Sequence, residues 1–126
     1  MSNNKNEILK YVIAELKTAI GPNVFRTFKL LDQINDFPSL CLNITRDDRV
    51  FDESANLGGT FILTIRGYVH NEDSIGASDQ LIEDVETVIK SLSLSLFDSM
   101  RVVSVVTDEG LFTPYGIIDI EILVDY

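Results

Sequence analysis

Apolar residues near the start of the chain recur at the spacing of an α-helix. They are Ile8, Leu9, Val12, Ile13, Leu16, Ala19 and Ile20. Asn3 or Asn4 can cap the start of such a helix, and the pair Gly21-Pro22 is a stop signal. The pattern therefore predicts one amphipathic helix that ends just before Gly21.

Two later segments show the alternation of a half-buried β-strand. Leu40, Leu42 and Ile44 alternate with smaller or polar neighbours over Ser39–Thr45, and a longer alternation covers Thr60–His70. Residues 23–38 fit neither period and are interpreted as irregular or short strand. Residues 46–59 are polar and end in Gly58-Gly59, which predicts a long loop of the kind that often binds a partner.

The second half of the chain predicts a second helix and two more strands. An apolar stripe at helical spacing follows a turn at residues 71–73 and consists of Leu81, Ile82, Val85, Val88, Ile89 and Leu92. Arg101–Thr107 and Gly116–Val124 are rich in β-branched residues and are joined by a hairpin-like loop over 108–115. We expect an α+β fold: a four-stranded, mostly antiparallel sheet with two helices packed on one face, or a mixed sheet if the second helix is a crossover.

Size and composition predict a single domain over residues 1–126. The chain is 45% hydrophobic and 24% charged, which is the range of globular proteins. It has no run of roughly 18 apolar residues, and its polar start does not resemble a signal peptide. We therefore expect a cytosolic protein without membrane contact, in which the lone Cys41 is a small buried hydrophobe.

Negative charge is concentrated in the second part of the chain. Residues 1–50 carry seven basic and six acidic side chains, whereas residues 51–126 carry three basic and fourteen acidic ones, giving a net charge of −10. Such a surface repels phosphate backbones, and no basic patch is visible. This charge argues against a protein that grips DNA or RNA, and it also serves plain solubility.

Motifs for catalysis, cofactors and metals are missing from the sequence. The only histidine, His70, ends a predicted strand without a nucleophile that the sequence places beside it. Asp47, Asp48, Asp52 and Glu53 lack the spacing of a calcium loop, and Gly58-Gly59 precedes a strand where a phosphate loop would precede a helix. We predict no enzyme, cofactor or metal site.

The predicted hairpin loop is unusually apolar for an exposed connection. Leu111, Phe112 and Tyr115 lie in it and must pack either on the body of the domain or on a partner. If they pack on a partner, these three residues are the predicted interface of an interaction protein.

Several motifs follow one another in a recognisable order. Ile65-Arg66-Gly67-Tyr68-Val69 ends a long strand, and an acidic turn and the helical segment Leu81-Ile82-Glu83-Asp84-Val85-Glu86 follow. Thr107-Asp108-Glu109-Gly110 then precedes a Pro-x-Gly loop and a terminal alternating strand. In order and spacing, residues 37–126 resemble the tail terminator proteins of long-tailed bacteriophages.

The resemblance implies a structural virion protein of the phage tail that is assembled in the bacterial cytoplasm. Such a protein forms a ring, expected to be a hexamer, on the head-proximal end of the tail tube, stops tube polymerisation and offers a surface for head joining. Its partners would be its own copies, the tail tube protein and a head-completion or connector protein. DNA would pass through the ring without being gripped, and Asp47, Asp48, Asp52 and Glu53 are the first candidates for an acidic lining.

Two other functions are compatible with the same residues. Another neck or baseplate protein of a virion would differ only in its partner. A cellular oligomeric ligand-binding module would instead require a defined pocket for a small molecule.

Overall fold

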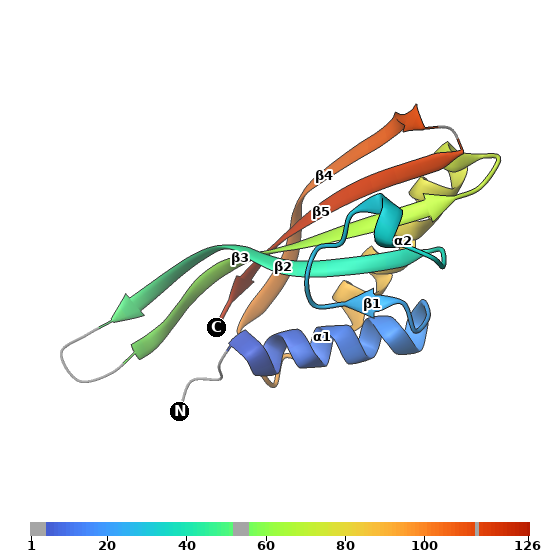
Figure 1. Cartoon of the computed structure of the whole chain (residues 1–126). Coiled ribbons are helices and arrows are strands. Elements are labelled where there is room, and N and C mark those ends of the chain that lie inside the picture. Colours follow the sequence, from blue (N-terminus) through green and yellow to red (C-terminus); the bar gives the residue numbers. More distant parts are fainter. Residues whose placement is uncertain (1–4, 52–55, 113) are drawn as a thin grey trace.

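The computed structural model describes residues 5–51, 56–112 and 114–126, and only the backbone of residues 49–51, 56–58 and 109–112 among them. Two α-helices and five strands form one α+β unit (Figure 1). The elements in chain order are α1 (Lys5–Ala19), β1 (Val24–Phe25), a short 3₁₀ turn (Leu31–Gln33), β2 (Ser39–Phe51), β3 (Asn56–His70), α2 (Ser74–Ser91), β4 (Ser99–Phe112) and β5 (Tyr115–Asp125). The predicted α+β class is confirmed.

The sheet has five strands in the order β1-β2-β3-β5-β4, and it is mixed. β1 runs parallel to β2, whereas the β2–β3, β3–β5 and β5–β4 pairs are all antiparallel. The prediction of four strands was wrong by one, because β1 has only two residues and no alternation can be detected over that length. The alternative of a mixed sheet with α2 as a crossover is correct. α2 connects β3 to β4, which run in the same direction on either side of β5, while the hydrogen-bonded parallel pair is β1–β2.

β2 and β3 form a long hairpin whose far end projects from the body of the domain (Figure 1). The predicted loop over 46–59 was wrong, because both strands continue through most of it, with Asp47 opposite Phe61 and Arg49 opposite Gly59. A register shift between Ile44 and Arg46 interrupts the alternation. Arg46–Asp48 are charged and exposed, so this part of β2 has no apolar face from which a strand could be predicted.

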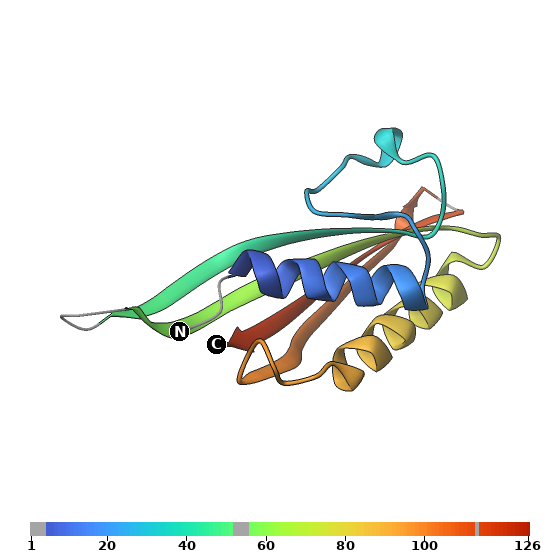
Figure 2. The same cartoon turned by 90° about the horizontal axis from the view of Figure 1, so that it is seen from below.

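The main core lies between one face of the sheet and the two helices, as predicted. α1 and α2 pack on the same side of the sheet (Figure 2). The sheet contributes alternate residues of its three central strands to this core: Leu40, Leu42, Phe61, Leu63, Ile65, Val69, Ile118, Ile120, Ile122 and Val124. The helices contribute their apolar stripes: Ile8, Leu9, Val12, Leu16, Leu81, Val85, Val88 and Ile89.

A segment that contains only the short 3₁₀ turn covers part of the opposite face. Residues 26–37 cross the sheet on the side away from α2 (Figure 2) and pack on a small second core. The buried residues of this second core are Ile34, Cys41 and Tyr68. The partly buried residues packed against them are Phe25, Phe28, Leu31, Phe37 and Ile117. The mixed apolar pattern of residues 23–38 follows from this packing, because an irregular segment that binds a sheet face need not obey either period.

β4 and β5 form a hairpin that leaves almost no loop. The predicted loop over 108–115 was wrong, because β4 extends to Phe112, and Phe112 pairs with Tyr115 at the start of β5. In β5 the burial of side chains alternates strictly along the strand, as its sequence predicted.

Side chains of α2 and β5 pack directly on Gly67 of β3, and we predict that Gly67→Ala destabilises the fold. A Cβ there would lie 2.8 Å from side-chain atoms of both Leu81 and Ile118. We expect a loss of about 1–3 kcal/mol in the free energy of unfolding, measured by urea denaturation. Asn43→Ala, at an exposed position of β2, should change the stability by less than about 0.5 kcal/mol. Equal effects of the two substitutions would contradict this account of Gly67.

Tyr68 anchors the covering segment, and we predict that Tyr68→Phe lowers stability most at neutral pH. The Tyr68 hydroxyl donates a hydrogen bond to the Lys29 carbonyl oxygen, which contributes about 1 kcal/mol. Burial raises the pKa of Tyr68 above its usual 10.0. The folded state therefore holds this proton more tightly than the unfolded state, and the stability contributed by Tyr68 is lost as the pH rises above 10.0.

The difference in unfolding free energy between the native chain and Tyr68→Phe should accordingly shrink between about pH 7 and about pH 10.5. Urea titrations of both proteins at the two pH values measure it. A difference that stays constant would contradict the role of the buried hydroxyl.

Candidate functional site

Three aromatic rings gather where β3 ends and β5 begins, and we call Phe37, His70 and Tyr115 the aromatic end. His70 and Tyr115 are cross-strand partners, and their rings stack with centroids 4.4 Å apart. The Phe37 ring lies 5.5 Å from that of His70 and 5.8 Å from that of Tyr115. Such contacts hold the three rings in a fixed arrangement at the surface.

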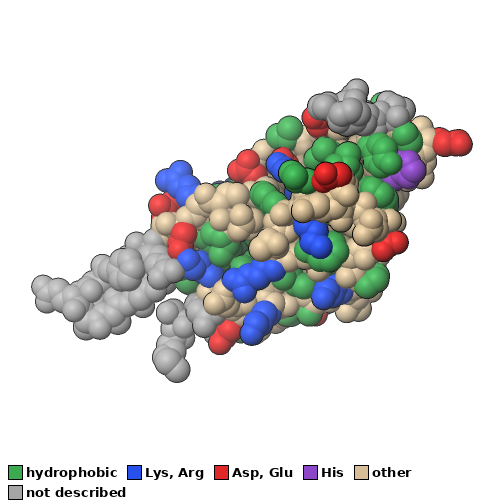
Figure 3. All heavy atoms as spheres, in the orientation of Figure 1, with side chains coloured by type: hydrophobic (Ala, Val, Ile, Leu, Met, Phe, Trp, Pro, Cys, Tyr) green, Lys and Arg blue, Asp and Glu red, His purple; other side chains and the backbone are tan. Residues whose placement is uncertain are grey.

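A shallow groove runs beside the aromatic end. Its lining is mostly apolar and consists of Leu31, Asp32, Ile34, Phe37 and Tyr115. In the space-filling view the histidine lies among hydrophobic side chains at the end of the molecule opposite the projecting hairpin (Figure 3). A rigid apolar surface with a polar rim is suited to contact with another protein.

Of the three predicted interface residues, the structure describes the side chain of Tyr115 alone. Tyr115 belongs to the aromatic end and is half-buried against His70 and Phe37. The backbone of Leu111 and Phe112 forms the end of β4, and their side chains lie outside the described residues. The proposed contact through Leu111, Phe112 and Tyr115 therefore remains a prediction.

Of the four residues predicted to form an acidic lining, the structure describes Asp47 and Asp48. Both form ion pairs with basic side chains. Asp47 forms an ion pair with Lys5 at the start of α1. Asp48 forms an exposed ion pair with Arg46, with nitrogen and oxygen 2.8 Å apart. Asp52 and Glu53 lie outside the described residues. The described part of the hairpin therefore carries balanced charges.

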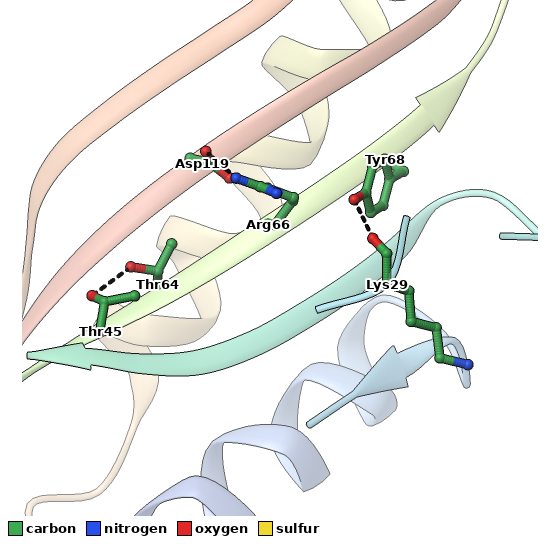
Figure 4. Close-up of polar contacts among 6 residues, drawn as sticks. All are labelled: Lys29, Thr45, Thr64, Arg66, Tyr68 and Asp119. Atoms are coloured by element: carbon green, nitrogen blue, oxygen red, sulfur yellow. Dashed lines mark hydrogen bonds and ion pairs between the residues drawn. The ribbon is translucent and has the colours of Figure 1, made fainter. Parts of the chain in front are cut away.

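The sheet face opposite the helices carries a row of polar contacts that was not predicted (Figure 4). Arg66 donates two hydrogen bonds to the Asp119 carboxylate, at 2.8 and 3.0 Å, and its guanidinium lies 4.9 Å from the centre of the Phe28 ring. These hydrogen bonds are the main cause that raises the pKa of Arg66. Thr45 and Thr64 share a further hydrogen bond of 3.0 Å.

Arg66 and Asp119 lie in different strands, and nothing in the sequence around either residue joins them. Their pairing depends on β3 lying directly beside β5 in a register that sets Arg66 opposite Asp119. No local pattern encodes that register, because the two residues are 53 positions apart. On this face Arg66 therefore partly neutralises the negative charge that Asp119 and Glu121 bring to β5.

The lone cysteine, Cys41, belongs to the second core. Cys41 is fully buried, and burial raises the pKa of its thiol, so the reactive thiolate form is disfavoured. Within the part of the chain that the structure describes, no three His, Cys, Asp or Glu side chains are grouped so that they could hold a metal ion. No helix among the described residues is both long and apolar enough to cross a membrane.

Comparison with solved structures finds the same fold in a virus-like particle. A chain of the structure titled "Virion of native gene transfer agent (GTA) particle" superimposes with a TM-score of 0.59 at 10% identity. The match covers 92% of this chain and 91% of that chain. At this identity the likeness establishes the fold alone. No curated protein sequence matches the chain.

Comparison with family models gives a match over nearly the whole chain. The model described as "Bacteriophage Tail Tube Terminator Protein" matches residues 5–126. This span includes every element of the fold and all the motifs on which the resemblance rests. The chain belongs to the family of bacteriophage tail tube terminator proteins, whose members are structural proteins of the phage tail.

Proposed function

We propose that the protein forms a ring, expected to be a hexamer, that caps the head-proximal end of the tail tube. The ring stops tube polymerisation and provides the surface to which the head joins. The family match over residues 5–126 carries this proposal. The protein acts through its surfaces, without catalysis, and works in the tail of the virion after assembly in the bacterial cytoplasm.

A capping subunit needs different surfaces for its neighbours, the tube and the head. The two ends of the sheet differ in kind. The β2–β3 hairpin projects at one end (Figure 1), and the aromatic end and its groove lie where β3 ends and β5 begins. We assign the aromatic end to contact with another protein of the tail, because its rings are already held in place before any partner binds. Leu111 and Phe112, at the end of β4, would extend this contact.

The charge of the subunit suits a ring around DNA. A net charge of −10 raises the electrostatic cost of DNA contact and disfavours tight binding to a passing duplex. Asp47 and Asp48 contribute less to this effect than the sequence suggested, because Lys5 and Arg46 accompany them. The negative charge of the second part of the chain supplies most of it.

Mixing the purified chain with the tail tube protein of its own phage tests the cap. We expect tubes of limited length with density at one end in negative-stain electron microscopy. Native mass spectrometry should show a species of six times the 14.1 kDa chain. The tube protein of an unrelated phage is the control and should grow to the same length with and without the chain. Tubes of unaltered length with the cognate protein would refute the capping function.

Phe112→Ala combined with Tyr115→Ala tests the contact at the aromatic end. We expect the doubly substituted chain to stay folded and to lose assembly with its copies or with tubes, because truncation of aromatic residues in an interface costs about 2 kcal/mol or more each. Assembly is measured by the same microscopy and the fold by circular dichroism. Leu94→Ala, at an exposed position between α2 and β4, is the control. Unchanged assembly with an intact fold would remove these residues from the interface.

A further inference from the structure

β4 is an edge strand whose outer side is open. Of the strands that the structure describes, only β5 pairs with β4, at Ser99–Val102, Ser104–Asp108 and Phe112. Natural sheets commonly guard such an edge with lysine or proline. The stretch Ser99–Asp108 contains neither, and its one basic residue is Arg101.

Three valines on this edge are exposed. Val103, Val105 and Val106 have 43%, 39% and 57% of their surface accessible. Val105 pairs with Ile120 and so lies on the helix side of the sheet, whereas Val106 pairs with Asp119 and lies on the opposite side. Because the apolar surface wraps around the edge, a partner that covers it must approach the edge itself.

A groove on the helix side adjoins the same edge. It lies between the second half of α2 and the first half of β4, and it is lined by Glu86, Ile89, Lys90, Met100, Arg101 and Val102. Side chains of a strand added beside β4 would have room there.

The other side of the sheet offers a second open edge. β1 pairs with β2 only at Leu40 and Cys41, so none of the described strands pairs with the outer edge of β2 over residues 42–51. Rows of paired residues cross the sheet from one open edge to the other. One such row on the face opposite the helices contains Ser104, Glu121, Thr64 and Asn43. Ser104 and Asn43 therefore lie at the same level along the strand direction, one on each open edge.

The two sides of the molecule differ in charge. Among residues 5–48, which include α1, β1 and most of β2, six basic side chains balance six acidic ones. Residues 59–108 and 114–126 carry three basic and eleven acidic side chains, a balance of −8. Figure 3 shows many Lys and Arg side chains along the side where α1 lies. Copies that meet with unlike sides together therefore suffer less repulsion than copies that meet with like sides.

We propose that the open edge of β4 in one copy pairs with the open edge of β2 in the next, so that the sheet continues from subunit to subunit. The contact is head to tail, as ring closure requires. The two strands run antiparallel, because three antiparallel pairings separate β2 from β4 and rotation about the ring axis keeps the sense of each strand. The inference rests on the proposed ring and names its subunit contact.

Substitution of the exposed valines tests the apolar part of the contact. Val103→Glu with Val106→Glu should keep the fold and lower the fraction of chain in rings at least about tenfold, because charges would be buried at the interface. The matched control is Ile75→Glu with Leu94→Glu, which adds the same charge at residues that are 57% and 66% exposed. The control should assemble as the native chain does. Normal rings from the valine variant would overturn the proposal.

Cysteine cross-linking tests which edges meet. One chain carries Ser104→Cys and another carries Asn43→Cys, and a short bismaleimide is added to assembled rings of each alone and of the mixture. We expect covalent dimers only in the mixture, since Cys41 is fully buried. Dimers from Ser104→Cys alone would show β4 against β4 and overturn the proposal, as would rings without cross-links.

The outcomes separate this inference from the proposed function. Capped tubes or rings that survive the valine substitutions retain the function and remove the β4–β2 contact. If the unmodified chain neither associates with itself nor caps cognate tubes, both are overturned.

Discussion

The pairing of β3 with both β2 and β5 is the constraint on which the rest of the structure depends. β3 is the middle of five strands, and its helix-facing residues contribute to the main core. Gly67 lets α2 approach the same strand closely. On the other face β3 provides Tyr68, which holds residues 26–37, and Arg66, which joins β5. A shift of one residue in its register would exchange the two faces and disrupt both layers.

The sequence predicted the elements whose surroundings are uniform along their length. α1, α2, β5 and the second half of β3 each have one side on the main core, so their apolar residues recur at a regular interval. Prediction failed for strands that contact the main core over only part of their length or are too short to show a pattern. β2 loses its apolar face near Arg46, while β1 is too short to show any period. The extension of β4 to Phe112 depends on pairing with β5, which local composition does not record.

The candidate site was predictable by residue type and not by arrangement. Tyr115 stood out as an aromatic residue in a supposed loop, and it does lie at the surface with two other rings. Phe37 and His70 come from distant parts of the chain, so only the sheet register brings them to Tyr115. In the sequence, the valines of β4 look like those of any strand. Their exposure follows from the strand order, which places β4 at an edge of the sheet. The family match agrees with this picture of a protein that acts through surfaces.

The unguarded edge of β4 is also a hazard for the subunit before assembly. An exposed, valine-rich strand edge can template pairing with any unfolded or partly folded chain, which is the first step of aggregation. The acidic charge on the same side of the molecule counters that tendency by colloidal repulsion, and it does so only while the carboxylates are ionised. With a sequence isoelectric point near 4.3, the free subunit carries this protective charge at neutral pH and loses it as the pH falls toward that value.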